Sequence, residues 1–174
     1  MSLRHHLRPL LAATVLLVAC GSGTAVAAPP TSAPTLGVDG HVQLFPGLEF
    51  FHVQTTATKA ADGSTSGSFL GTGEVRSGPV DLPIPLSLTG PVTCLDVQGS
   101  SVSFLYTVDS AQPKFLNDVI AHTTSVLFTI VKGANGTPDR VGFFGPLPTA
   151  YFHGCGPIGT PLVFNGTVDI GGGS

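Results

Sequence analysis

Apolar and polar residues alternate over short segments of this chain, and Gly or Pro ends most of these segments. Alternation with a period of two places every second side chain on one face of a β-strand. An apolar pattern with the 3.6-residue period of a helix nowhere persists for three turns. The pattern predicts one helical turn over Phe115 to His122. It predicts strands near residues 41–45, 49–58, 66–76, 86–97, 101–109, 123–132, 139–144 and 161–170.

About eight strands joined by close turns predict an all-β fold, either a single antiparallel β-sandwich or a closed β-barrel. The pattern does not choose between the two. The domain is expected to cover residues 36–170, which is the size of one domain. Residues 28–35, APPTSAPT, are expected to form a flexible linker, and residues 171–174 a flexible tail.

The stretch GPVTCLDVQGSSVSFLYTV, residues 90–108, predicts a hairpin with its turn at Gly99-Ser100. This turn places three pairs of residues opposite one another on one face: Val97 with Val102, Leu95 with Phe104, and Thr93 with Tyr106. Cys94 then lies on the other face, which it shares with Asp96, Ser103 and Leu105.

Two further features concern the second half of the chain. Asn135-Gly136 predicts a reversal between the segments 126–131 and 141–144, longer than a two-residue turn because Thr137-Pro138 follows. Gly166 is expected to form a bulge in the last strand. That strand places four apolar residues on one face: Leu162, Phe164, Val168 and Ile170.

Residues 1–27 have the features of an export signal. Arg4 and Arg8 precede an apolar run over residues 10–19 that is too short to span a membrane permanently. Two cleavage sites are open. Leu17-Val18-Ala19-Cys20 resembles a bacterial lipobox, which would make Cys20 a lipidated first residue, whereas Ala25-Val26-Ala27 fits ordinary A-x-A cleavage after Ala27. The expected location is extracellular or on the cell surface, with a lipid anchor in the first case.

Export also bears on the cysteines. Thiols pair in oxidising compartments, and both cleavage routes leave Cys94 and Cys155 free to do so. We therefore predict a Cys94–Cys155 disulfide, in which the glycine-rich segment 153–157 reaches Cys94 from a covering loop. A catalytic Cys94 would need a polarising base and an open site, whereas its neighbours are mainly apolar. The nucleophile and metal-ligand alternatives for Cys94 would return if the disulfide were absent.

The segment Val92-Thr93-Cys94-Leu95-Asp96-Val97-Gln98-Gly99 resembles the V-T-C-L-x-V-x-G core of an uncharacterised family of exported bacterial β-proteins. A Ser/Gly-rich strand precedes that core, here residues 64–73, and an N-G-x-x-D-type turn follows it, here residues 135–139, before a second cysteine. The resemblance covers most of residues 45–170. It departs at Ser100 and over the Pro-containing segment 79–91. It implies the all-β fold and the disulfide, and it implies no activity.

Charge excludes one class of partner. Without Arg4 and Arg8, five basic side chains stand against ten acidic ones, a formal net charge of −5. Phosphate binding depends on concentrated Lys and Arg, so we expect no nucleic-acid partner. Docking on anionic lipid is equally disfavoured, which leaves a lipid anchor at Cys20 as the expected route to a membrane.

Recognisable catalytic and metal motifs are missing from the sequence. Gly63-Ser64-Thr65-Ser66-Gly67 has Thr65 where a G-x-S-x-G elbow has its serine, and the elbow needs a strand-to-helix turn. Glu49 and Glu74 are the only glutamates, and their spacing does not mark them as a hydrolytic pair. The histidines outside the signal form no H-E-x-x-H or H-x-H pattern: His41, His52, His122 and His153. We therefore expect no catalytic residue, cofactor or metal.

The eleven phenylalanines include two adjacent pairs, Phe50-Phe51 and Phe143-Phe144, whose members point to opposite faces of a strand. One ring of each pair needs a covering layer, or it lines an apolar pocket or a partner surface. The leading hypothesis is an exported, non-catalytic β domain that binds an unknown partner or has a structural role in the cell envelope. The alternative is a barrel-type carrier of a small apolar ligand, and a hydrolase ranks third.

Overall fold

The computed structural model of the protein describes residues 32–172. Its elements, in chain order, are β1 (Thr35–Phe45), β2 (Leu48–Lys59), β3 (Thr65–Ser77), β4 (Val80–Gln98), β5 (Ser101–Thr107), β6 (Ser110–Gln112), α1 (Lys114–Ile120), β7 (Thr124–Val131), β8 (Asp139–Pro148), the 3₁₀ turn η1 (Thr149–Tyr151) and β9 (Leu162–Gly171). Within residues 32–172, no helix has the length and apolar character that crossing a membrane requires.

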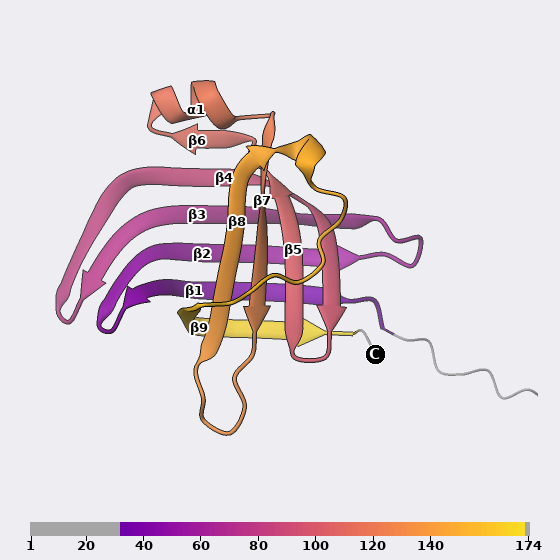
Figure 1. Ribbon diagram of the computed structural model, residues 1–174, viewed down its shortest axis with the longest axis horizontal. Coiled ribbons are helices and arrows are strands. Elements are labelled where there is room, and N and C mark those ends of the chain that lie inside the picture. Colours follow the sequence, from indigo (N-terminus) through magenta and orange to yellow (C-terminus); the bar gives the residue numbers. More distant parts are fainter. Residues whose placement is uncertain (1–31, 173–174) are drawn as a thin grey trace, which may run out of the picture.

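The strands form one closed ring of antiparallel neighbours in the order β3-β2-β1-β9-β8-β7-β5-β4, and pairing of β3 with β4 closes it. The short strand β6 pairs with β4 outside the ring. The ring is flattened, so that β5, β7 and β8 run across β1, β2, β3 and β9 (Figure 1). The structure therefore confirms the all-β fold and, of the two expected architectures, has the closed one.

The strand β4 belongs to both layers of the ring. Its residues 80–91 pair with β3, and its residues 92–98 pair with β5. In Figure 1 it runs beside β3 and then turns to run beside β5. This bend is what carries the sheet from one layer to the other.

Alternate residues of the ring strands point inward and fill the interior. In β1 the buried positions are Leu36, Val38, Gly40 and Val42, which confirms the period of two. Aromatic rings occupy the centre. Phe69 stacks on Tyr106 with 3.8 Å between ring centroids, and Phe104 stacks on Phe128 at 5.4 Å. Phe69 and Phe128 also pack at 5.4 Å, which joins the two stacks into one cluster.

Each of the eight predicted strands overlaps an observed one, and the predicted helical turn is α1. The strand β1 starts at Thr35, six residues before the predicted start, because Gly37 and Gly40 weaken the apolar pattern there. β6 was not predicted, since three residues are too short to show alternation. The reversal at Asn135-Gly136 is confirmed, with β7 and β8 paired from Val131 opposite Arg140.

Two details of the predicted strands are wrong. Val97 lies opposite Val102 and Leu95 opposite Phe104, as expected, but Tyr106 pairs with Val92 and not with Thr93. The register shifts between Val92 and Cys94, because an extra residue is accommodated where β4 bends. In β9, Gly166 forms no bulge with β1. A Cβ at Gly166 would lie 2.5 Å from the Cα of Gly40, so this glycine permits close approach of the two strands.

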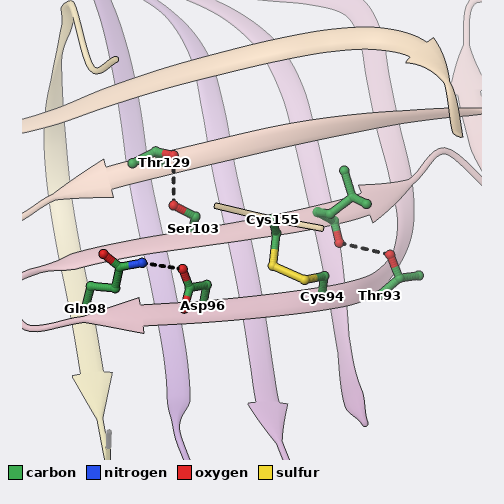
Figure 2. The surroundings of a disulfide bond; sticks show 8 residues. Thr93, Cys94, Asp96, Gln98, Ser103, Thr129 and Cys155 are labelled. Atoms are coloured by element: carbon green, nitrogen blue, oxygen red, sulfur yellow. Dashed lines mark hydrogen bonds between the residues drawn. A yellow bond between two sulfur atoms is a disulfide. The ribbon is translucent and has the colours of Figure 1, made fainter. Parts of the chain in front are cut away.

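The predicted disulfide is present. Cys94 and Cys155 are joined with 5.9 Å between their Cα atoms, and they are separated by 61 positions in the sequence (Figure 2). Cys155 belongs to the covering segment, which we define as residues 149–161. As expected, Cys94 lies on the outer face of the hairpin, where it packs with Leu105, Leu127 and Cys155 in a small second core.

Thr129 also fastens the covering segment to the ring. Its hydroxyl lies 2.9 Å from the Ser103 hydroxyl, and its Oγ1 accepts a hydrogen bond of 3.0 Å from the backbone N–H of Ile158. The Thr129 side chain is fully buried. Thr55 provides a contrast, because its buried Oγ1 has no hydrogen-bond partner among residues 32–172.

Replacing Cys94 by Ser should lower the free energy of unfolding by about 4 kcal/mol, the chain-entropy value for a loop of this length. We expect the melting temperature to fall by roughly 10–15 °C. The double change at Cys94 and Cys155 should cost little more than either single change, because each removes the same cross-link. Thermal unfolding measures both effects. Two free thiols in the denatured, unreduced wild type would contradict the prediction.

The same substitution should have opposite effects at two buried threonines. Thr129→Val leaves the Ile158 N–H and the Ser103 hydroxyl without their partner, so it should destabilise the protein by about 1–3 kcal/mol. Thr55→Val replaces an unpaired hydroxyl by a methyl group, so it should be neutral or stabilising by up to about 1 kcal/mol. Urea unfolding of both variants gives the comparison. A loss of stability at Thr55→Val equal to that at Thr129→Val would refute it.

Candidate functional site

An apolar pocket lies beside residues 143–146 of β8, which follow the part of this strand that pairs with β9. These strands pair only over Asp139–Val141 and Leu162–Phe164, after which β8 continues beside β7 alone. The pocket has a volume of about 180 Å³. Its walls come from β1, β2, β4, β5, β7 and β8, and they include Leu44, Phe50, Phe51, Leu86, Leu88, Phe143 and Pro146.

Phe143 forms one wall of this pocket. It follows the buried Val141 by two positions, so it points to the interior side of β8, and its ring packs against Phe128 at 5.6 Å. Nevertheless, 49% of Phe143 is exposed. An inward-facing aromatic ring that stays half exposed marks the place where the core is left uncovered.

The rings of the two Phe-Phe pairs are found in both of the expected surroundings, an apolar pocket and a covering layer. Phe50, Phe51 and Phe143 line the apolar pocket. Phe144, on the opposite face of β8, packs edge-on against Phe152 of the covering segment at 6.2 Å, although 54% of it remains exposed. A covering layer and a pocket therefore account for different rings of these pairs.

A polar cluster lies on the outer face of β1, β2 and β3. His41 and His52 are directly opposite each other in the β1–β2 pair, and their rings stack with 4.4 Å between centroids and 12° between planes. Nε2 of His52 lies 2.7 Å from Oδ1 of Asp39. Nε2 of His41 lies 3.3 Å from Oε2 of Glu74. We call the three residues His41, His52 and Glu74 the histidine cluster.

Charged side chains surround the histidine cluster. The Arg76 guanidinium lies 3.5 Å from Glu74, 3.6 Å from Glu49 and 3.6 Å from Asp81. Glu49 accepts a hydrogen bond of 2.7 Å from the Asn165 amide. The ligand-type atoms of the histidine cluster all lie within 4.8 Å of one another, so these residues could together hold a metal ion.

Three carboxyl groups here have shifted pKa values. The hydrogen bond from His52 holds the pKa of Asp39 below its usual value. Burial acts to raise the pKa of Glu74, but hydrogen bonds from Asp81 and His41 outweigh it and lower that pKa. The hydrogen bond with Glu74 in turn raises the pKa of Asp81, because the protonated form of Asp81 can donate to the neighbouring carboxylate.

The other residues considered from the sequence lie elsewhere. His122 pairs with Asp109 at 3.1 Å, and His153 is exposed in the covering segment. Ser64 lies in the turn before β3, where its hydroxyl donates to Asp62 at 2.6 Å. Cys20 and the export signal fall outside the described residues.

The two glutamates, by contrast, come together on either side of His41. Their spacing in the sequence did not indicate that they lie together. For the histidines a signal was present: counting back along both strands from a hairpin turn at Pro46-Gly47 places His41 opposite His52.

Comparison with known proteins identifies no relative. No protein-family model, curated protein or solved structure matches the chain. The likeness to a family of exported β-proteins therefore stays a prediction, and function has to be argued from the pocket and the cluster.

Changing His52 to Ala should raise the pKa of Asp39 toward its ordinary value, since the largest cause of its depression is removed. A depressed carboxyl pKa stabilises the folded state above the unfolded-state pKa, and this contribution is lost as pH falls through the folded-state pKa. The difference in stability between wild type and His52→Ala should therefore shrink in acid. An NMR pH titration of the Asp39 carboxyl carbon in chelator-treated protein measures the shift. An unchanged titration would contradict the assignment, and His153→Ala serves as the control.

Proposed function

We propose that the protein is an exported, non-catalytic binding domain whose apolar pocket receives an apolar side chain of a partner protein. The observation that carries the proposal is the half-exposed, inward-facing Phe143 beside about 180 Å³ of apolar space. Soluble proteins normally cover such surfaces, and those left open are commonly binding sites.

Size favours a side chain as the occupant. A cavity of about 150 Å³ lined by apolar residues binds benzene, whereas pockets for whole small molecules usually measure about 300–1,000 Å³. The pocket described here is close to the first value. It therefore suits one aromatic or branched aliphatic side chain at the centre of a larger contact.

Export is part of the proposal. The expected signal in residues 1–27 supports it, and so does the disulfide, because such bonds persist mainly in oxidising compartments. The mature chain would begin at Ala28 and be released, or begin at a lipidated Cys20 and stay on the cell surface. Intact mass of the protein from its host distinguishes these two forms.

The second candidate, a carrier of a free apolar ligand, rests on the same pocket. The aromatic cluster inside the ring counts against a ligand enclosed at its centre, because Phe69, Phe104, Tyr106 and Phe128 occupy that space. Native mass spectrometry of protein from the host separates the candidates. A stoichiometric bound small molecule would favour the carrier.

Phe143→Ser and Phe144→Ser test the pocket as a matched pair, since the two rings are similarly exposed and only Phe143 lines the pocket. With benzene as the probe, Phe143→Ser should weaken binding roughly 5–30-fold, corresponding to the loss of about 1–2 kcal/mol of apolar contact. Phe144→Ser should leave it nearly unchanged. NMR titration gives both affinities, with thermal unfolding as the check on folding. Equal effects of the two substitutions would exclude the pocket as the site.

A further inference from the structure

The histidine cluster has the composition of a metal site. Two imidazoles and one carboxylate come from three neighbouring strands, with their ligand-type atoms within 4.8 Å of one another. We propose that His41, His52 and Glu74 bind a divalent transition metal ion of the zinc class. This site is separate from the apolar pocket, which none of these three residues lines.

The distances are close to those that zinc requires. Tetrahedral zinc with bonds of about 2.0–2.2 Å places its ligand atoms roughly 3.3–3.6 Å apart. Nε2 of His41 and Oε2 of Glu74 are already 3.3 Å apart. The two imidazole planes are nearly parallel, so His52 has to rotate about its side-chain bonds to direct a lone pair at the same point. The strand pairing below does not need to change.

A further shell of side chains would orient the ligands. Asp39 accepts a hydrogen bond from one ring nitrogen of His52, which leaves the other nitrogen with its lone pair. Glu49 lies 3.9 Å from Nδ1 of His41 and can hold that ring once its Nε2 binds the metal. Carboxylate–histidine–metal arrangements of this kind are common in zinc proteins.

The charge of the region also favours a dication. Four carboxylates, those of Asp39, Glu49, Glu74 and Asp81, surround the histidines. Arg76 is the one Lys or Arg that forms ion pairs with any of them within residues 32–172. With neutral histidines these five side chains carry a formal charge of −3, which a divalent ion reduces to −1.

Arg76 is then a competitor of the metal. Its guanidinium lies 3.5 Å from the proposed ligand Glu74 and 3.4 Å from the His41 ring. The Arg76 side chain is 44% exposed, so it can leave the cluster for solvent when the metal binds. Removing the Arg76 side chain should therefore strengthen metal binding.

The ligand types determine which ions bind. Imidazole nitrogens favour zinc, copper and nickel, whereas calcium and magnesium need sites made of oxygen ligands. Three protein ligands leave a fourth position of a tetrahedral ion for water. The histidines are partly exposed on the outer face of the sheet, which gives the ion a path from solvent.

The test uses the whole mature chain from Ala28, with its disulfide intact and without a polyhistidine tag. This chain lacks His5 and His6 of the signal. Zinc is titrated against a chromophoric chelator, and cobalt(II) is added separately to read ligand geometry from its absorption. We expect one ion per chain, and no competition from a large excess of magnesium.

Substitutions assign the ligands. His41→Ala and Glu74→Gln each remove a ligand and should weaken zinc binding at least ~100-fold. Asp39→Asn should weaken it roughly 10-fold, as substitutions of orienting residues do in other zinc sites. Arg76→Met should strengthen zinc binding. His153→Ala is the matched control and should change nothing. In the wild type, zinc should shift the imidazole NMR signals of His41 and His52 and leave those of His122 and His153 in place. Because the NMR measurement uses the wild type, it remains informative even if a variant fails to fold. No binding, binding that survives His41→Ala, or weaker binding in Arg76→Met would overturn the proposal.

Discussion

Pairing between β3 and β4 is the contact on which the rest of the structure depends, because it converts a row of strands into a ring. Closure leaves unpaired edge where β8 and β9 part, and every strand must then supply inward residues to one shared interior. The filled centre, with Phe69 against Tyr106 and Phe104 against Phe128, follows from that requirement. The pocket lies beside residues 143–146 of β8, beyond the three residues that pair with β9.

Much of this fold could be predicted from the sequence, and the exceptions have physical causes. Alternation located eight strands, and the turn at Gly99-Ser100 placed Leu95 opposite Phe104 correctly. The predicted pairing was wrong at Thr93, because β4 has an extra residue at its bend and no local sequence pattern indicates it. A glycine within a strand, such as Gly166, indicates either a bulge or a close approach of another strand. Here it is a close approach, because Gly40 lies directly opposite. Closure of the ring depends on β3 meeting β4, and the sequence pattern left it open.

The sites were less predictable than the strands. The cysteine pair could be predicted because the expected export and the alternation in the hairpin both limited which residue could partner Cys94. His41 and His52 share no spacing motif, and only strand register brings them together. Glu74 joins them through β3, whose register with β2 shifts between Glu49 and Phe51, so its position could not be counted from the turn. The doubled phenylalanines did indicate apolar surroundings, yet which ring would line a pocket depended on the path of β8.

The covering segment has a further consequence for how the chain behaves before its disulfide forms. Leu105 and Leu127 point away from the ring interior and are buried beside the cross-link that holds Cys155 over them. Until that bond exists, a short chain segment alone shields these leucines on the outside of an otherwise finished ring. A reduced, newly made molecule would therefore present adhesive surface and be liable to self-association. Formation of the disulfide would hide these two leucines, so a folded but reduced chain should bind a hydrophobic dye more strongly than the oxidised chain.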